Sequence, residues 1–367
     1  MKKILFLIPT LGGGGAERVL VNLVNNLDKQ RYDITIRTLF NTDVNSNFLN
    51  NNIKFFKGKV KQFKGNTYLL KLFSPRFLYK FFIEDKYDIV VSYLEGPTAR
   101  IISGCTDKNT KKVSWIHCEH ESKKAFKHSF RSFAEAKKCY MCYDSTICVA
   151  DSVKQNFLSF VNVDNCKVLY NTNETEKILS KAEESLDVTL SNEINIFSVG
   201  RLTYVKGYER LINIHKKLLD EGIKHHVYVL GTGEEYEKLS QIINKLGVED
   251  TFHLLGFKSN PYKYVKKSDL FVCSSWREGF STAVTEALIL GIPVVSTCCS
   301  GAYEMLGYNN EYGIVTENSE EGLYQGLKHI LEDEQILAFY TKQARIRGKE
   351  FSTKMTVDAV QEMFESL

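Results

Sequence analysis

The chain has 367 residues, 43% of them hydrophobic and 25% charged, which is the composition of an ordinary soluble globular protein with room for two domains. It contains no uninterrupted apolar run of about 18 residues, so the sequence predicts no membrane-spanning helix. Nine cysteines, an odd number spread from Cys105 to Cys299, argue against a disulfide framework and favour a reducing cytoplasm.

The net charge of +4 hides an asymmetry between the two halves of the chain. Residues 1–170 contain 27 Lys and Arg against 15 Asp and Glu, an excess of 12 positive charges, whereas the remainder has an excess of 8 negative charges. The first half is therefore the part in which we look for a surface that binds an anionic partner.

The amino-terminal stretch predicts a strand over Lys3–Ile8, a glycine-rich loop over Pro9–Gly15 and an amphipathic helix over Ala16–Leu27. Strand, glycines and helix in this order form a phosphate-binding layout. The loop lacks the glycine spacing of a dinucleotide fingerprint and is followed by no P-loop lysine. Gly14 and Gly15 are therefore expected either to let the backbone approach a ligand closely or only to make the loop flexible.

Basic and aromatic residues alternate after the strands predicted at Tyr32–Leu39 and Ile53–Phe56. Such a mixture fits a surface that lies on anionic lipid, and it equally fits an ordinary helix with one core face and one solvated face. A second basic cluster between Lys123 and Lys138 favours the membrane surface, and no nucleic-acid recognition motif accompanies the charge. The first stretch comprises Lys57, Lys59, Lys61, Lys64, Lys71, Arg76, Lys80 and Lys86 with Phe63, Tyr68, Leu69, Leu70, Leu72, Phe73, Phe77, Leu78, Tyr79, Phe81 and Phe82.

Further strands are predicted at Asp88–Tyr93 and at Lys112–His117. A histidine at the carboxyl end of a strand points into the crevice where open α/β sheets bind their ligands. His117 is therefore a candidate site residue, with a purely structural hydrogen bond as the alternative.

A polar segment over Asn171–Asn192 is expected to contain the domain boundary. After it, strands alternate with helices again, as they do in the first half. This alternation predicts an α/β fold with two doubly wound parallel sheets, one in each domain. The predicted elements of the second set are Ile194–Val199, Tyr208–Leu219, His226–Leu230, Glu234–Leu246 and Thr251–Leu255.

The loop from Gly200 to Gly207 joins a predicted strand to a helix and contains two cations. Arg201 and Lys206 can both reach one diphosphate, Arg201 as a fork of donors and Lys206 as a point charge. Each alone is more simply read as a solvated surface residue. Gly231 marks a further turn with close backbone approach.

Two carboxylates and a helix start follow the apolar strand Leu270–Cys273. Glu278 lies on the loop at the strand's carboxyl end, and Glu286 lies about one turn into the next helix. The backbone amides of the three residues after Glu278 lie at the positive end of that helix and can bind phosphate. A ligand with hydroxyls at both ends and phosphate between them fits this set, which describes a nucleotide sugar. The three amides belong to Gly279, Phe280 and Ser281.

These residues resemble those of retaining glycosyltransferases of family 4, which have the GT-B architecture of two facing Rossmann-like domains with a central cleft. The likeness covers nearly the full length. It is most specific at Glu278 and Glu286 with Gly279-Phe280, supported by Arg201, Lys206, His117 and the stretch Gly14-Gly15-Ala16-Glu17-Arg18.

The resemblance implies a role for each residue. Glu278 would contact the donor sugar, Glu286 the ribose hydroxyls, and Arg201 and Lys206 the diphosphate. His117 would lie near the transferred sugar and the acceptor, and the glycine loop near both substrates. It also implies that no metal and no cofactor is needed.

The resemblance further implies transfer of a hexose or N-acetylhexosamine, with UDP-sugars favoured, to a glycan acceptor that is lipid-linked, in capsule, exopolysaccharide or O-antigen assembly. The expected location is the cytoplasm, peripheral on the inner face of the plasma membrane. The expected domains are residues 1–175 for the acceptor and 176–345 for the nucleotide sugar, with a helix at 346–367 that packs back on the first domain.

Two other functions remain open at this point. A nucleotide-sugar epimerase of the same shape would isomerise the donor without an acceptor, and a non-catalytic module would bind the sugar nucleotide without hydrolysing it. The sequence does not distinguish the base, the sugar, the acceptor or the linkage.

Overall fold

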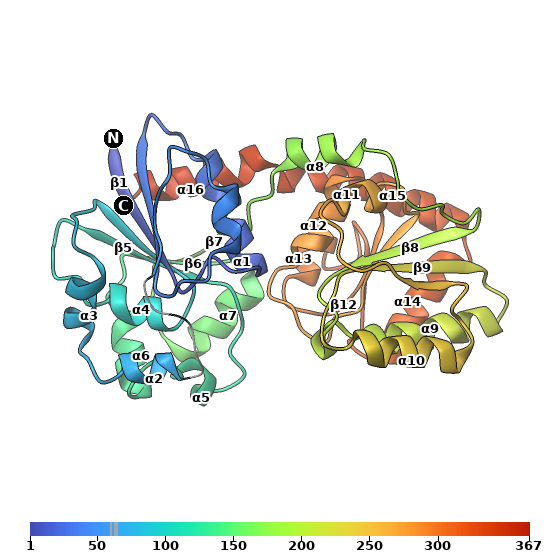
Figure 1. Ribbon diagram of the computed structural model, residues 1–367, viewed down its shortest axis with the longest axis horizontal. Coiled ribbons are helices and arrows are strands. Elements are labelled where there is room, and N and C mark those ends of the chain that lie inside the picture. Colours follow the sequence, from blue (N-terminus) through green and yellow to red (C-terminus); the bar gives the residue numbers. More distant parts are fainter. Residues whose placement is uncertain (59–60, 62–64) are drawn as a thin grey trace. The chain divides into compact units, whose positions relative to one another are not determined.

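The computed structural model describes residues 1–58, 61 and 65–367, so Lys59, Phe63 and Lys64 of the basic, aromatic stretch lie outside the described residues. The chain divides into two compact units, one made of Met1–Thr172 and Lys354–Leu367 and the other of Asn173–Thr353. Each unit contains one sheet in which all paired strands are parallel. The predicted α/β class with two doubly wound, Rossmann-like sheets is therefore confirmed (Figure 1).

The first unit has a seven-stranded sheet in the order β3-β2-β1-β4-β5-β6-β7. The crossover from β1 leads toward β2 on one side, and β4 and β5 follow on the other, so the strand order reverses between β1 and β4. Ligands of such sheets bind at this reversal, beyond the carboxyl ends of the strands. The strands are β1 (Lys2–Ile8), β2 (Tyr32–Thr38), β3 (Lys54–Phe56), β4 (Ile89–Tyr93), β5 (Lys111–Ile116), β6 (Ser145–Cys148) and β7 (Cys166–Val168).

Helices cover both faces of the first sheet, with α3, α4 and α6 on one side and α16 on the other (Figure 1). The helices are α1 (Gly15–Asn26), α2 (Asn66–Leu70), α3 (Pro75–Phe82), α4 (Pro97–Ile102), α5 (Lys123–Phe126), α6 (Phe133–Tyr140), α7 (Asp151–Phe160) and α16 (Thr353–Glu365), with a 3-10 turn η1 (Val44–Phe48).

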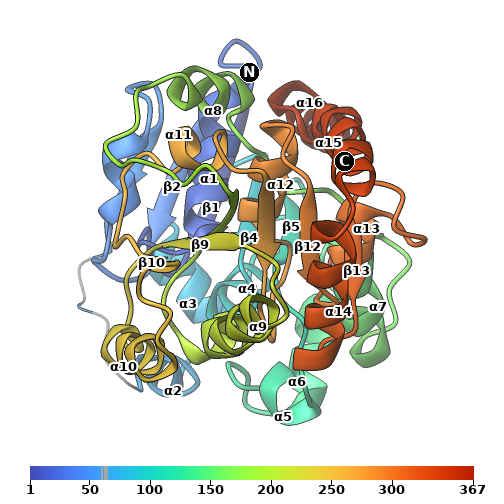
Figure 2. The ribbon, with the colours of Figure 1, turned by 90° about the vertical axis from the view of Figure 1, so that its right-hand side faces the viewer.

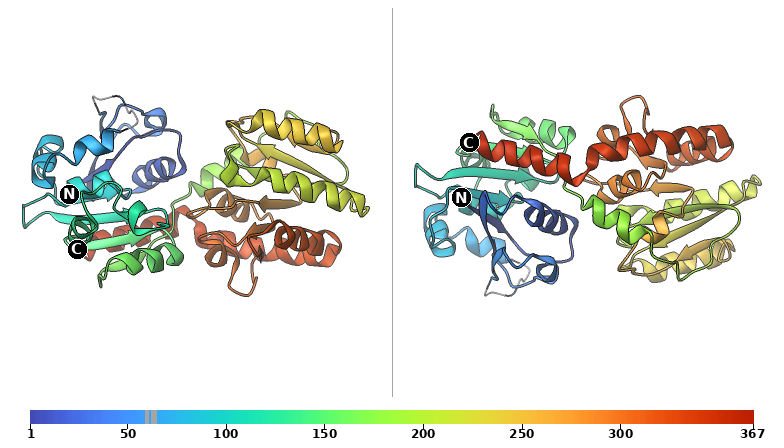
Figure 3. Two further views of the ribbon diagram at one scale, coloured as in Figure 1. Left: turned by 90° about the horizontal axis from the view of Figure 1, so that it is seen from below. Right: turned by 90° about the horizontal axis from the view of Figure 1, so that it is seen from above.

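The last helix joins the first unit although it follows the second unit in sequence. The Phe364 ring of α16 packs at 6.2 Å from Phe6 of β1 and at 5.9 Å from Tyr32 of β2, measured between centroids. Lys2 Nζ pairs with Glu365 Oε2 at 3.0 Å. Both chain ends therefore lie close together in this unit (Figure 3).

The second unit has a six-stranded sheet in the order β10-β9-β8-β11-β12-β13, which reverses between β8 and β11. Figure 2 shows α9, α10 and α14 on one side of this sheet and α8, α11, α12 and α15 on the other. The strands are β8 (Ile194–Val199), β9 (His225–Leu230), β10 (Phe252–Leu254), β11 (Leu270–Cys273), β12 (Val294–Thr297) and β13 (Ile314–Thr316). The helices are α8 (Thr175–Ala182), α9 (Tyr208–Asp220), α10 (Tyr236–Leu246), α11 (Tyr262–Val265), α12 (Thr282–Ile289), α13 (Ala302–Leu306), α14 (Glu320–Leu331) and α15 (Glu334–Gly348), with η2 (Tyr204–Lys206) and η3 (Lys349–Phe351).

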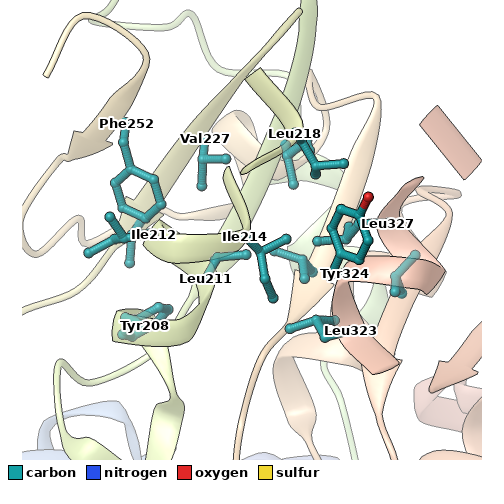
Figure 4. Close-up of a cluster of buried hydrophobic side chains, with 14 of the residues drawn as sticks. Tyr208, Leu211, Ile212, Ile214, Leu218, Val227, Phe252, Leu323, Tyr324 and Leu327 are labelled. Carbon is teal, nitrogen blue, oxygen red and sulfur yellow. The ribbon is translucent and has the colours of Figure 1, made fainter. Parts of the chain in front are cut away.

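The core of the second unit fills the space between α9, α14 and the sheet (Figure 4). Leu211 and Leu218 lie on the inward face of α9, and Leu323 and Leu327 lie on α14 opposite them. Each is buried, which stabilises the unit by about 1.5–3 kcal/mol per side chain. This packing holds α9, and with it the loop that precedes α9, in a fixed place on the sheet.

Two polar segments of the sequence contain short helices. The polar segment 171–192 includes α8, whose Ile178 is buried, and the asparagine-rich segment 41–52 includes η1. Both elements have few apolar residues, so hydrophobic periodicity gave little sign of them.

Candidate functional site

The loop after β8 is held close to the sheet by its glycines. Gly207 has φ +67°, a left-handed conformation that favours glycine, and a Cβ at this position would lie 2.1 Å from the Ser274 carbonyl oxygen. Gly200 packs under the side chains of Tyr208 and Lys206. The loop therefore lies directly against the loop after β11.

The loop after β11 is fixed by hydrogen bonds to this neighbour. Ser274 Oγ donates to the Lys206 carbonyl at 2.8 Å, and the Trp276 amide donates to the Val205 carbonyl at 2.7 Å. From α9, the buried Arg210 donates to the Ser274 carbonyl through Nε at 2.8 Å and Nη2 at 2.5 Å. Both loops meet at the point where the strand order of the second sheet reverses.

Two predicted site residues form an ion pair at this point. Lys206 Nζ lies 2.5 Å from Glu278 Oε1, with the side chains 26% and 15% exposed. Ser275 Oγ donates to the same carboxylate oxygen at 2.7 Å. Burial lowers the pKa of Lys206, but the negative charge of Glu278 outweighs it and the net shift is upward, so this lysine is a cation at neutral pH.

A small cavity of about 10 Å³, close to the size of one water molecule, lies beside the ion pair, between the ends of β8 and β11. Lys206, Glu278 and Ser281 line it together with Ser275 and Tyr208. Ser281 is the residue before α12, and its side chain does not cap the helix. The pocket thus combines a cation, a carboxylate and the amino end of a helix, which suits a ligand with phosphate and hydroxyl groups.

The remaining predicted residues of this unit lie outside the pocket lining. Arg201 is exposed, and within the part of the chain that the structure describes its guanidinium has no hydrogen-bond or ion-pair partner. Glu286 accepts a hydrogen bond from the Tyr262 hydroxyl at 3.2 Å and is half-buried. A Cβ on Gly231 would lie 1.9 Å from the Gly200 carbonyl oxygen, so a neighbouring backbone already accounts for this glycine.

Phe280 and Gly279 differ in how far they are exposed to solvent. The Phe280 side chain is buried against Phe351, with ring centroids 6.0 Å apart, and Gly279 is half-buried. The Phe280 ring therefore belongs to the core.

In the first unit, His117 lies immediately after β5 and is 5% exposed. Its amide donates to Glu95 Oε2 at 3.0 Å, and its ring lies 4.8 Å from that of Tyr93, centroid to centroid. Burial lowers the pKa of His117 to about 3, so the imidazole is neutral at neutral pH. Its Nε2 has no hydrogen-bond partner among the described residues.

The glycine loop of the first unit leads into α1. Gly14 precedes the helix, and a Cβ there would lie 2.2 Å from Glu17 Oε2. No heavy atom of the described residues lies within 4 Å of a Cβ built on Gly15. The Glu17 side chain is flexible and can move away from such a Cβ, so this contact does not require glycine at Gly14, and Gly15 faces open space.

Comparison with known proteins decides the family. Residues 13–177 match Glycosyltransferase Family 4, and residues 181–347 match Glycosyl transferases group 1. The Campylobacter jejuni "N-acetylgalactosamine-N,N'-diacetylbacillosaminyl-diphospho-undecaprenol 4-alpha-N-acetylgalactosaminyltransferase" is 30% identical over 369 residues, which cover 98% of this chain and 99% of that protein. The chain belongs to the GT-B glycosyltransferases of the surface-polysaccharide type.

Two further similarities fit this family. A second C. jejuni glycosyltransferase, an "alpha-1,4-N-acetyl-D-galactosaminyltransferase", is 27% identical, with 96% of this chain and 95% of that protein covered. The Anabaena HepE protein, solved in complex with UDP, has a TM-score of 0.78 at 20% identity, with both chains covered in full. The second likeness concerns the fold alone.

The described residues of this glycosyltransferase contain neither a membrane-crossing helix nor a metal-binding cluster. Among its helices, none combines the length and the apolar composition that a membrane crossing requires. The same residues bring no three His, Cys, Asp or Glu side chains into a metal-binding arrangement.

The structure adds residues to the glycosyltransferase site that sequence reasoning missed. The Ser275 hydroxyl donates to Glu278, the Tyr262 hydroxyl donates to Glu286, and Arg210 donates to the Ser274 carbonyl in the loop that leads to Glu278. Arg210 also lies with its guanidinium carbon 3.7 Å from the centre of the Trp276 ring. Arg210 follows an ordinary amphipathic pattern on α9, so no local signal distinguished it from a solvated arginine.

Proposed function

We propose that this glycosyltransferase is a retaining enzyme that moves a hexose or N-acetylhexosamine from a UDP-sugar to a lipid-linked glycan in capsule, exopolysaccharide or O-antigen assembly. The observation that carries the donor part of the proposal is the pairing of Lys206 with Glu278 beside a pocket at the reversal of the second sheet.

The roles in donor binding follow from the charges at the pocket. Lys206 and the unpaired Arg201 bind the diphosphate, and the amides of Gly279 and Phe280 at the start of α12 bind its oxygens. Glu278 leaves Lys206 when the donor enters and accepts hydrogen bonds from the sugar hydroxyls. Glu286, held by a tyrosine, accepts from the ribose hydroxyls. The UDP in the HepE structure supports a uridine donor by analogy of fold.

The chemistry we propose breaks the bond between the sugar anomeric carbon and the phosphate oxygen and forms a bond to the acceptor oxygen on the same face. Negative charge develops on the leaving diphosphate, and the cationic side chains of Lys206 and Arg201 stabilise it. The leaving phosphate takes the proton of the acceptor hydroxyl, so no protein nucleophile and no metal is required.

Retention is supported by the names of the two C. jejuni relatives, which specify α-linkages. An α-linked UDP-sugar that yields an α-glycoside keeps its anomeric configuration. Determining the anomeric configuration of the product tests this part.

The lipid-linked acceptor is supported by the diphospho-undecaprenol in the name of the C. jejuni relative. We assign the acceptor to the first unit, where the buried, neutral His117 has no hydrogen-bond partner for its Nε2 among the described residues. We place the enzyme on the inner face of the plasma membrane. The excess of basic residues in that half of the chain supports an anionic membrane as its partner.

A donor screen tests the proposal. UDP- and GDP-sugars are added to the purified protein, and the melting temperature and slow donor hydrolysis are measured, because a ligand of the native state raises the melting temperature. The expected result is stabilisation and hydrolysis with a UDP-sugar, both lost in Lys206→Ala and retained in Lys217→Ala, whose lysine pairs with an exposed glutamate elsewhere in the unit. Conversion of the donor into an isomeric sugar without an acceptor would instead identify an epimerase.

A further inference from the structure

An exposed apolar surface lies on α2, α3 and the turn between them. Phe73, Phe77 and Phe81 form a stack, with ring centroids 5.2 Å and 6.2 Å apart and ring planes within 20° of parallel. Their exposed fractions are 46%, 50% and 64%. We name this surface the apolar row, and it consists of Tyr68, Leu69, Leu72, Phe73, Phe77 and Phe81.

The apolar row is a consequence of how α3 packs. The helix starts at Ser74, whose Oγ accepts from the Phe77 amide, and it buries Leu78 toward the protein. Phenylalanines spaced four residues apart then share the opposite, outward face. Single exposed apolar residues are ordinary, but six exposed within residues 68–81, three of them stacked, mark an interaction site.

The second basic cluster of the sequence lies beside this row. Arg131, between α5 and α6, donates through Nε to the Lys71 carbonyl at 2.5 Å and through Nη2 to the Leu72 carbonyl at 2.9 Å. The Tyr68 hydroxyl lies 3.3 Å from His128 Nε2. Segments far apart in sequence thus form one surface, with α2, α5 and α6 side by side (Figures 1 and 2).

This surface is almost free of acid. Residues 65–82 and 122–138 contain nine Lys and Arg and one acidic residue, Glu135. The Glu135 carboxylate is neutralised by Arg100, whose Nη2 lies 2.9 Å away, and by the Arg131 amide. Partial burial lowers the pKa of Lys71, and the nearby positive charges of Arg100 and Lys127 lower it further. The surface therefore carries uncompensated positive charge around an apolar row.

We propose that the apolar row and the surrounding lysines and arginines dock the protein on an anionic phospholipid bilayer. The aromatic rings lie at the boundary between headgroups and acyl chains, and the cations contact lipid phosphates. The inference deepens the proposed function, on which it rests for a lipid-linked acceptor. Positive charge from two segments lies around the exposed aromatic rings, which matches a membrane surface that presents many anionic headgroups.

The test measures sedimentation of the full chain with vesicles of phosphatidylcholine alone or with about 30% phosphatidylglycerol, the anionic lipid supplying the surface potential. The wild-type protein is expected to sediment with the anionic vesicles and not with the neutral ones, and less so at high salt. Phe77→Ser/Phe81→Ser is expected to weaken binding by about a hundredfold, about one decade per buried ring. Phe339→Ser, which changes a phenylalanine that is 49% exposed on α15, is the matched control and should bind like the wild type.

A charge variant separates the electrostatic contribution. Lys123→Glu/Lys124→Glu should reduce binding to anionic vesicles about tenfold or more at low salt. Lys266→Glu/Lys267→Glu, two exposed adjacent lysines of the second unit, makes the same charge change and should have little effect.

Donor hydrolysis without vesicles should be unchanged in the phenylalanine variant and in the Lys123→Glu/Lys124→Glu variant. A failure of the proposed function would therefore appear as a lack of hydrolysis, and a failure of docking would appear as a lack of sedimentation with vesicles. Wild-type protein that stays in the supernatant overturns the inference, as does unaltered binding by the phenylalanine variant. If that variant instead converts a wild-type dimer to a monomer, the row belongs to a second copy of the chain and the inference is wrong.

Discussion

Arg210→Met tests whether Arg210 of α9 fixes the loop that contains Glu278. The guanidinium makes three hydrogen bonds, two to the Ser274 carbonyl and one to Asn318 Oδ1 at 3.0 Å, and it supports the Trp276 ring. Methionine preserves most of the volume but leaves these acceptors without their charged donor. Arg210 therefore acts as a positioning residue for the donor pocket.

The size of the effect follows from these contacts. Hydrogen bonds from a charged group are worth about 1.5–3 kcal/mol each, and relief of the cost of burying the charge offsets part of the sum, so we expect a loss of about 3 kcal/mol. For a unit of this size, that loss lowers the melting temperature by about 6–12 °C. A displaced loop should also reduce kcat/KM for donor turnover by about 10²-fold.

The assay combines thermal unfolding with steady-state donor hydrolysis at a temperature where the variant is folded. Arg345→Met, which changes an exposed arginine of α15, is the control and should alter neither quantity appreciably. Arg210→Met with an unchanged melting temperature would refute the structural reasoning. A lowered melting temperature with wild-type kcat and KM would show that the pocket does not depend on this arginine.

Three further predictions concern the buried histidines, a loop glycine and metal ions. His215 Nδ1 lies 2.8 Å from His225 Nε2, and burial, followed by the neighbouring His225, lowers the pKa of His215 to about 2. A histidine in the unfolded chain has a pKa of about 6.5 and binds a proton below that pH, whereas folded His215 stays neutral. The free energy of unfolding should therefore be highest above pH 6.5 and fall by about 2 kcal/mol by about pH 5. Thermal unfolding across this range should show the decline, and His215→Phe should lessen it. Gly207→Ala places a Cβ against a backbone carbonyl at positive φ, so it should lower the free energy of unfolding by at least about 1–2 kcal/mol and remove most of the donor turnover. Gly222→Ala is the control, because Gly222 has positive φ but open space around it, and it should lower the stability only through the unfavourable backbone conformation. EDTA should leave transfer unchanged if the cationic side chains alone neutralise the diphosphate; a strict requirement for added Mg²⁺ or Mn²⁺ would contradict the metal-free mechanism.

Much of the fold could be predicted from the sequence because short apolar strands, glycine turns and amphipathic helices report local geometry directly. The boundaries of β8 and the start of α12 follow from such signals. Helix α8 could not be predicted from such signals, because its sequence is polar and its stability comes from contacts with other elements. The exposure of Phe77 was equally hidden, since a phenylalanine at helical spacing predicts a core face as readily as a surface.

The candidate site was predictable in its residues but not in its connections. Lys206 and Glu278 could be proposed from their places at strand ends, yet their contact joins positions 72 apart in the chain and depends on neighbouring strands. The hydrogen bonds of Ser275 and Tyr262 to the two carboxylates likewise exist only in three dimensions. Gly231 shows the converse, because the neighbouring backbone explains it without any ligand.

The most direct test of the central claim is donor turnover by Lys206→Ala and Glu278→Gln, measured beside the Lys217→Ala control under saturating acceptor. Lys206→Ala removes a cation that stabilises the leaving diphosphate, and Glu278→Gln weakens the acceptor of the hydrogen bonds from the sugar hydroxyls, so each should reduce kcat/KM by about 10²–10³-fold while the protein stays folded. Wild-type turnover in both variants would contradict the assignment of this pocket as the donor site.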